Sequence, residues 1–505
     1  MKLLVSLFTL LLVNLFAFAQ SIPLKKLPEY TLPASETEAH LRFIASDELQ
    51  GRMTGEPGSK VAARYMAEQF RLFGIQPVKG QNSYYQNISF SKKESSGSGK
   101  MVVGEDTLTI GKDLVLTSGE ALSLKNVPYI YVNYGWTDDK GYDDYKNVDV
   151  KGKIVIARWG TPDTAISTKY LGAQFEASKR KEEMAQKNGA VALIEVFTAK
   201  ISFKRVIRFF GGGIKPKADD LKDDKPMAHC LMDSVFWTKL NSNAAQTASL
   251  QIIPAFATVL ISPNVVGVLE GSDPKLKNEY VILSAHYDHL GMIHRDPTKP
   301  ADQDTIFNGA RDNGFGCSAL LLAAKSLSIQ RPRRSILFIS FTGEEEGLFG
   351  SDYYAKHPLI PLKDCVYAFD TDGAGYNDTT VVTTIGLERT DCSTEIKQSA
   401  AAFGLKVIDD PAPEQNLFDR SDNVSFAAQG IPAPDFAPGL TKFDGDILKY
   451  YHQLGDQVET VSFTYFHKYC QTFAYAARLI ANRDKKPKWR AGDKYEKAYN
   501  ALYKL

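Results

Sequence analysis

Cysteine is scarce in this chain, and its cysteines form no framework. The 505 residues include five, an odd number at wide spacing: Cys230, Cys317, Cys365, Cys392 and Cys470. This pattern excludes a disulfide-stapled fold, and the absence of a CxxC pair leaves no redox motif. We expect these residues to be small buried hydrophobes with at least one free thiol, although one pair can still oxidise if the chain is exported.

A charge imbalance is also lacking. The chain has 60 basic and 59 acidic residues, so its formal net charge is +1. Such a balance gives no electrostatic case for binding nucleic acid or an anionic membrane surface. With 44% hydrophobic residues, ordinary globular folding is expected, and 505 residues exceed one hydrophobic core, which predicts two or three domains.

A long apolar run occurs at residues 3–19, after a single lysine. It ends in Ala17-Phe18-Ala19 before Gln20, a small-x-small pattern that suits signal-peptidase cleavage. We therefore expect residues 1–19 to be a signal peptide and the mature protein to be exported, periplasmic or extracellular, without stable membrane insertion. The alternative is an uncleaved anchor, for which the run is slightly short. No cysteine follows it, which disfavours a lipid anchor.

The remaining chain divides into three segments that differ in their helix and strand patterns. Residues 20–115 include two helical patterns around a turn-rich break at 46–60, and residues 116–255 alternate strand and helix patterns with a single histidine. We expect 116–255 to be an accessory domain. Residues 256–505 carry near-continuous apolar strands between helices, which predicts a mostly parallel sheet covered on both faces.

Several polar motifs follow the strands of the third segment. SAHYDHLG at 284–291 contains His286 and Asp288 two residues apart, so Asp288 can orient the imidazole if the segment is extended. Alone, this pattern also fits a structural histidine. NGARDNGFG at 308–316 places Asp312 in a glycine-rich turn before a buried helix, where a simple N-cap is the alternative.

Adjacent glutamates follow the next strand. Glu344 and Glu345 can diverge, one toward a metal and one toward substrate and water, so the pair can supply a ligand and a general base. A solvated acidic loop is the alternative. Asp370 and Asp372 end a further strand, and His452 lies far along the chain, where it is unremarkable by itself. Carboxylates gathered in one cleft repel unless a cation neutralises them, so the set indicates a metal site.

In order, these motifs resemble those of the M28 family of zinc aminopeptidases, from about His40 to the end of the chain. The matching elements are HYDHLG, NGARDNGFG, EEEGLFGS, the strand ending at Asp372, RSD with GIP, and His452 followed by Asp456. The resemblance implies an α/β zinc-exopeptidase fold, a mostly parallel mixed sheet with helices on both faces. It also implies a smaller, β-rich α/β protease-associated (PA) domain inserted at 116–255, and 46–59 resembles the leader of members with that insertion.

The resemblance also implies two zinc ions per chain. His286 and Asp372 would hold one, Glu345 and His452 the other, and Asp312 would bridge them. Glu344 would be the general base, Asp288 would orient His286, and Tyr451 would donate a hydrogen bond to the oxyanion. Arg420 and Asp370 are candidate substrate-binding residues, the latter in place of a frequent Asn. Phe315 replaces a small residue and is expected to narrow the pocket, and 294–307 is expected to form a rim or lid.

The expected function is therefore that of an exported metallo-aminopeptidase acting on peptides with a free N-terminus. Alternatives on the same fold are a glutaminyl cyclase and a carboxypeptidase. A catalytically silent binding protein is the alternative from another class, although the ligand set and the base are complete.

Overall fold

The computed structural model describes residues 33–504 apart from 96, 163–170, 200, 201, 211, 218–226, 243–245, 294–297, 299 and 301. The expected signal peptide at 1–19 lies outside the described residues, as does part of the expected rim at 294–307. Within the described part, no helix is both long and apolar enough to cross a membrane. Residues 1–87 with 263–505 form one compact unit and residues 88–262 form the other.

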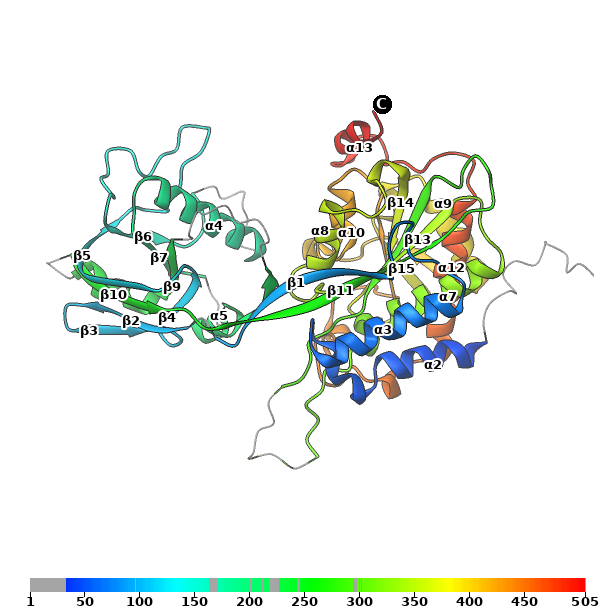
Figure 1. Cartoon of the computed structure of the whole chain (residues 1–505), viewed down its shortest axis with the longest axis horizontal. Helices are drawn as coiled ribbons and strands as arrows, with labels where there is room; N and C mark the ends of the chain where they lie inside the picture. The colour runs from blue at the N-terminus through cyan, green and yellow to red at the C-terminus, as the bar shows by residue number, and fades with distance from the viewer. Residues whose placement is uncertain are drawn as a thin grey trace, which may run out of the picture. The chain divides into compact units, whose positions relative to one another are not determined.

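The first unit is built around a mixed sheet with the strand order β16-β15-β17-β14-β12-β13-β11 (Figure 1). Its central strands β12, β13 and β14 are parallel, whereas β11 runs antiparallel to β13 and β15 antiparallel to β17. The strands are β11 (Ala257–Leu269), β12 (Tyr280–His286), β13 (Ser335–Phe341), β14 (Cys365–Asp370), β15 (Val381–Ile385), β16 (Lys406–Ile408) and β17 (Asp435–Ala437). The predicted α/β class is confirmed.

Helices cover both faces of this sheet because successive strand residues point to opposite sides. Leu283 and Ala285 join a core with α2 (Ala34–Ile44), α3 (Pro57–Leu72), α7 (Phe315–Ile329), α9 (Ser393–Ala402) and α12 (Phe463–Ala481). Ile282, which directly precedes Leu283, joins a second core with α8 (Phe349–Lys356), α10 (Asn423–Ala427) and α13 (Glu496–Tyr503). Every residue of β13 is buried, as expected for a strand with two covered faces.

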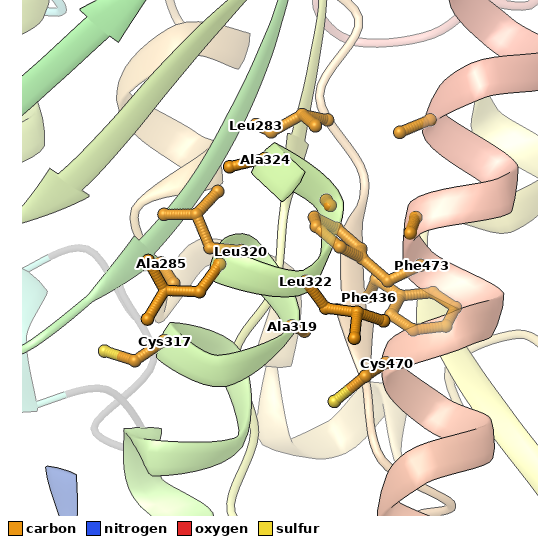
Figure 2. Close-up of a cluster of buried hydrophobic side chains, with 14 of the residues drawn as sticks. Leu283, Ala285, Cys317, Ala319, Leu320, Leu322, Ala324, Phe436, Cys470 and Phe473 are labelled. Carbon is orange, nitrogen blue, oxygen red and sulfur yellow. The ribbon is translucent and has the colours of Figure 1, made fainter. Parts of the chain in front are cut away.

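Helix α7 lies inside the first core. It is apolar nearly all round, and twelve of its fifteen residues are buried, as the sequence predicts. Figure 2 shows this helix between the strand that carries Leu283 and Ala285 and the side chains of Cys470 and Phe473 on α12. The five cysteines are buried and free, which confirms their expected role as small core residues. The N-terminus of α7 is thereby fixed beside the strand ends.

The second unit contains a sheet with the order β3-β2-β10-β5-β6-β7-β9-β4. Strands β5 (Leu122–Tyr131), β6 (Ile154–Arg158), β7 (Ala192–Phe197) and β9 (Ala228–Asp233) are parallel, and α4 (Leu171–Lys187) connects β6 to β7. The unit begins earlier than residue 116 because β2 (Ser98–Val103) pairs with β10 (Thr247–Ile253), and β3 (Asp106–Thr109) pairs with β2. Strand β1 (Tyr85–Lys93) pairs with β8 (Gly213–Pro216), and β4 (Leu114–Ser118) with β9.

A buried ionic cluster lies inside the second unit, although the sequence shows no clustered carboxylates beside strand ends there. Lys181 pairs with Glu195, and both are fully buried. His229 Nε2 lies 3.0 Å from Glu195 Oε1, and His229 Nδ1 lies 3.5 Å from Glu182 Oε2. The members come from α4, β7 and β9, so only the folded sheet brings them together. Such a cluster is tolerated in a core because each charge has a partner.

The cluster predicts a pH-dependent stability of the second unit. Burial lowers the pKa of His229, but hydrogen bonds to Glu182 and Glu195 outweigh this and raise it above its ordinary value. A raised pKa means that the protonated histidine stabilises the fold below its ordinary pKa, and that this contribution is lost as pH rises through the folded value. We expect the midpoint temperature of thermal unfolding of this unit to fall as pH rises above about 6.5. In His229→Gln, differential scanning calorimetry should show a flatter profile; an unchanged pH dependence would contradict the assignment.

Candidate metal centre

The predicted site residues meet at the carboxyl end of the central parallel strands. His286 is the last residue of β12, Asp372 follows β14 by two residues, and Glu344 and Glu345 follow β13. Asp312 lies in η4 (Ala310–Gly314), the turn that leads into α7, and the Asp312–Asn313 peptide bond is cis. Because parallel strands end at the same edge of a sheet, ligands gather there.

One end of the Asp312 carboxylate faces His286 and Asp372. His286 Nε2 lies 3.4 Å from Asp312 Oδ1 and 3.1 Å from Asp372 Oδ1. The potential ligand atoms of these three residues lie within 4.8 Å of one another. An imidazole nitrogen with two carboxylate oxygens is a donor set that suits zinc.

The other end of the same carboxylate faces His452 and Glu345. His452 Nε2 lies 3.1 Å from Asp312 Oδ2 and 3.1 Å from Glu345 Oε2. The two oxygens of Asp312 therefore point to two different groups of nitrogen and oxygen donors. This arrangement has room for a cation on each side of one bridging carboxylate.

His289 is a member of this region that the sequence reasoning left without a role. Its Nδ1 lies 2.6 Å from Glu345 Oε1, and it forms a second potential metal-binding group with Asp312 and Glu345. The ring is buried, and its Nε2 has no hydrogen-bond partner in the described structure. The signal was present in the sequence as the second histidine of HYDHLG, three residues after His286.

The electrostatics of the cluster favour a positive charge beside the buried carboxylates. Burial raises the pKa of Glu344 well above its ordinary range, with Asp372 and Glu345 adding to the rise while His286 opposes it. For Glu345, burial and Asp312 raise the pKa, but His289 and His452 bring it down to about 2. Burial lowers the pKa of His286, yet Asp372 and Glu344 raise it well above the ordinary value. Buried carboxylates in such proximity are most readily neutralised by metal cations.

Asp288 does not make the predicted side-chain contact with His286. Its Oδ1 lies 3.9 Å from His286 Nδ1, which is too far for a hydrogen bond, and the ring nitrogen instead lies 3.2 Å from the Asp288 backbone oxygen. The reason is that β12 ends at His286, so the alternation of an extended strand does not continue to Asp288. The carboxylate accepts hydrogen bonds from the Glu344 amide at 3.2 Å, the Glu345 amide at 3.4 Å and the Thr54 hydroxyl at 3.0 Å.

Asp370 lies behind Asp372 rather than in the open part of the site. It is 1% exposed and accepts hydrogen bonds from Ser284 at 2.5 Å and Ser421 at 2.9 Å. Burial, followed by Asp372, raises the pKa of Asp370 to about 7. Asp370 does not line the pocket, so the geometry does not support the predicted contact with substrate. The Ser421 hydroxyl donates to both Asp370 and the predicted ligand Asp372.

A pocket opens beside the predicted metal-binding residues. Asp312, Glu344, Asp372 and His452 line one part of it. The remaining wall is largely apolar and is formed by Ala374, Ile385, Leu417, Ala437, Leu440 and Phe443. Such a combination of a reactive corner and an apolar wall is typical of a small-molecule or side-chain pocket.

Arg420 and Tyr451 also line this pocket, as predicted for residues near substrate. Arg420 Nη2 donates to Tyr451 Oη at 3.1 Å, and the Tyr451 ring stacks on His452 with centroids 4.0 Å apart. Burial raises the pKa of the Tyr451 hydroxyl, so it stays protonated and can donate a hydrogen bond.

Phe315 does not narrow the pocket. It is the first residue of α7 and is fully buried against Phe466, Tyr376 and Tyr469. The expectation was wrong because the start of α7 turns this side chain into the core.

Comparison with known proteins shows which family model these residues match. The model of peptidase family M28 matches residues 264–477. Aminopeptidase YwaD of Bacillus subtilis (strain 168) is 26% identical over 231 residues, which cover 45% of this chain and 46% of YwaD. The chain thus spans about half the length of this curated relative.

Solved structures share the fold. An aminopeptidase from Aneurinibacillus sp. strain AM-1 matches with a TM-score of 0.56 at 20% identity, covering 89% of this chain and 94% of its own. A zinc aminopeptidase from Bacillus subtilis matches with a TM-score of 0.50 at 19% identity, covering 92% of this chain and 97% of its own. At this identity the likeness shows the fold alone.

Proposed function

We propose that the protein is a two-zinc aminopeptidase that removes N-terminal residues from peptides, and the match of peptidase family M28 to residues 264–477 supports this. One observation carries the proposal: the two oxygens of Asp312 face separate donor groups, His286 with Asp372 and His452 with Glu345. These five residues would hold the two ions. Bound zinc supplies Lewis-acid polarisation of a carbonyl and lowers the pKa of water.

Glu344 is the proposed general base. It lines the pocket, whereas Glu345 faces His289 and His452, so the two adjacent carboxylates have separate tasks. Glu344 would accept the proton of the attacking water and return it to the leaving amine. The hydrogen bonds from the Glu344 and Glu345 amides to Asp288 keep the pair in place. Tyr451 Oη would donate to the oxygen on which negative charge develops.

Selection for a free N-terminus would come from the carboxylates that line the pocket. Glu344, Asp372 and Asp435 lie in its wall, and carboxylates attract the α-ammonium group of an unblocked peptide. An apolar N-terminal side chain would contact Ile385, Leu440 and Phe443. Asp370 has no part in this step because it is buried behind the pocket.

Two further elements belong to the proposal. Export rests on the pattern of residues 1–19, and the role of the second unit as an inserted protease-associated domain rests on the alternation of strands and helices between β5 and β9. The bridge at Asp312 favours a peptidase over a glutaminyl cyclase, because the expected cyclase site holds one zinc. Complete donor groups favour an enzyme over a silent binding protein.

A panel of matched substrates tests the activity. We expect zinc-loaded protein to hydrolyse leucine p-nitroanilide at least about 100-fold better, in kcat/KM, than its N-acetyl form, because blocking removes the ammonium charge that the carboxylates pair with. Leucine should exceed glycine at the same position because of the apolar wall. Mass spectrometry of a peptide with N-terminal Gln supplies the control. Loss of ammonia from that peptide, or release of C-terminal residues, would contradict the aminopeptidase assignment.

A further inference from the structure

Arg52 is a buried cation in a segment that the proposed chemistry leaves without a role. It ends η2 (Asp47–Arg52) and is 0% exposed. Its guanidinium donates four hydrogen bonds, all to backbone oxygens: Nε to Tyr287 at 2.8 Å, Nη1 to Ile44 and Asn308 at 2.5 Å each, and Nη2 to Gly309 at 3.1 Å. The bonds to Tyr287, Asn308 and Gly309 join residues that are 235, 256 and 257 positions from Arg52 in the sequence.

The environment of this arginine differs from that of two other buried arginines in the unit. Arg311 pairs with Asp456 and Arg334 pairs with Glu279, whereas no carboxylate within the described residues lies at ion-pairing distance from Arg52. Burying a charge without an ionic partner is costly unless hydrogen bonds replace its hydration. The carbonyl oxygens around Arg52 provide that replacement, so their positions and that of the guanidinium depend on one another.

Three of the four carbonyls that Arg52 holds belong to the two segments that carry the shared metal-binding group. Tyr287 lies between His286 and Asp288, while Asn308 and Gly309 precede Asp312 by four and three residues, respectively. The backbone of Arg52 makes a further contact with the segment after β12: its carbonyl oxygen accepts a hydrogen bond from the His289 amide at 3.2 Å. One side chain therefore connects the end of β12 to the turn before α7.

We propose that Arg52 is a positioning residue of the metal centre, which sets the spacing between His286 and Asp312 by binding the backbone of both segments. This inference rests on the proposed function, since it assumes that the two residues share a zinc ion. Arg52 does not touch substrate or metal in this role. Its positive charge also lies close enough to Asp312 and Asp288 to interact with both, which reduces the repulsion among carboxylates before metal binds.

The fork of the guanidinium is essential to the proposal. Its nitrogens lie in one plane and point in fixed directions, which allows separate bonds to carbonyls on three segments. A lysine ammonium keeps the charge but offers its donors from a single atom, so it cannot reproduce the four contacts. A conservative Arg52→Lys change should therefore lose most of the positioning effect.

The test measures zinc binding in the full chain rather than activity alone. Metal-free wild type, Arg52→Lys and Arg52→Met are titrated with zinc against a chromophoric chelator, and their cobalt-substituted forms are compared by visible absorption. Arg334→Met is the matched control. Arg334 is also fully buried, but it lies before the first residue of β13, at the end of the strand opposite the site. Thermal unfolding of the metal-free proteins reports loss of fold.

We expect both Arg52 variants to bind zinc at least tenfold more weakly than wild type and to show a changed cobalt spectrum. In steady-state kinetics, kcat should fall by a larger factor than KM changes. Arg334→Met should lose thermal stability but keep wild-type zinc affinity and spectrum. If Arg52→Met does not fold, Arg52→Lys decides the matter. Wild-type zinc affinity and spectrum in the folded Arg52 variants would overturn the inference, whereas failure of the wild-type protein to bind zinc would overturn the proposed function.

Discussion

Replacing Glu344 by Gln is expected to lower kcat by about 10²–10⁴-fold while zinc binding persists. The amide has nearly the same shape as the carboxylate but cannot accept the proton of water at neutral pH. Glu344 lines the pocket, and the pairs formed by His452 and His289 involve Glu345, so the change should leave both donor groups intact. Steady-state kinetics with leucine p-nitroanilide, together with metal analysis of the same sample, check this result.

The run of three glutamates supplies the control. Glu346→Gln alters the next carboxylate in the same turn, which does not line the pocket, and it should retain activity within about threefold. Near-normal turnover in Glu344→Gln would exclude this residue as the base. Loss of zinc from that variant would instead show that Glu344 serves as a ligand, contrary to the division of tasks proposed for the pair.

Replacing Asp312 by Ala is expected to weaken both zinc sites at once and to abolish measurable activity. Asp312 is 4% exposed, and its carboxylate offers one oxygen to each donor group. Its removal leaves His286 and Asp372 on one side and Glu345 and His452 on the other without their common ligand. We expect the affinity of each site to fall by at least about 100-fold, since a ligand and not only its supporting contact is lost. Competition titration with a chelator measures the two sites.

Two further variants make this result specific. His452→Ala removes a donor from only one side of Asp312 and should weaken one site more than the other. Asp352→Ala removes a carboxylate that is 50% exposed on α8 and pairs with Lys356, and it should bind two zinc ions as the wild type does. Wild-type occupancy of both sites in Asp312→Ala would rule out the bridge, and with it the observation on which the proposed function rests.

The parts that could be predicted from the sequence are those governed by local pattern. Apolar runs of strand length, each followed by a histidine or carboxylate, predict a parallel sheet with polar residues at its carboxyl edge, and β12, β13 and β14 have this form. The apolar character of 318–327 likewise predicts a buried helix. These inferences hold because strand and helix periodicity and the direction of parallel strands depend on neighbouring residues.

Other features depend on contacts between distant segments. Asp288 follows the strand by two residues, so its carboxylate reaches the Glu344 and Glu345 amides instead of His286. Asp370 is turned toward Ser284 and Ser421, and Phe315 toward the core. In each case a local rule gives the position along the chain, but the direction of the side chain is set by the elements packed against it.

By itself, the sequence determined the class of fold, the order of the metal-binding motifs and the identity of the residues able to bind a cation. Only the tertiary structure decided that the two oxygens of Asp312 face different groups, that His289 joins Glu345, and that Arg52 holds the backbone on both sides of the site. The physical reason is the range of the interactions. Periodicity acts over a few residues, whereas these hydrogen bonds and charge contacts join segments up to about 250 positions apart and form only when the sheet and its helices are assembled.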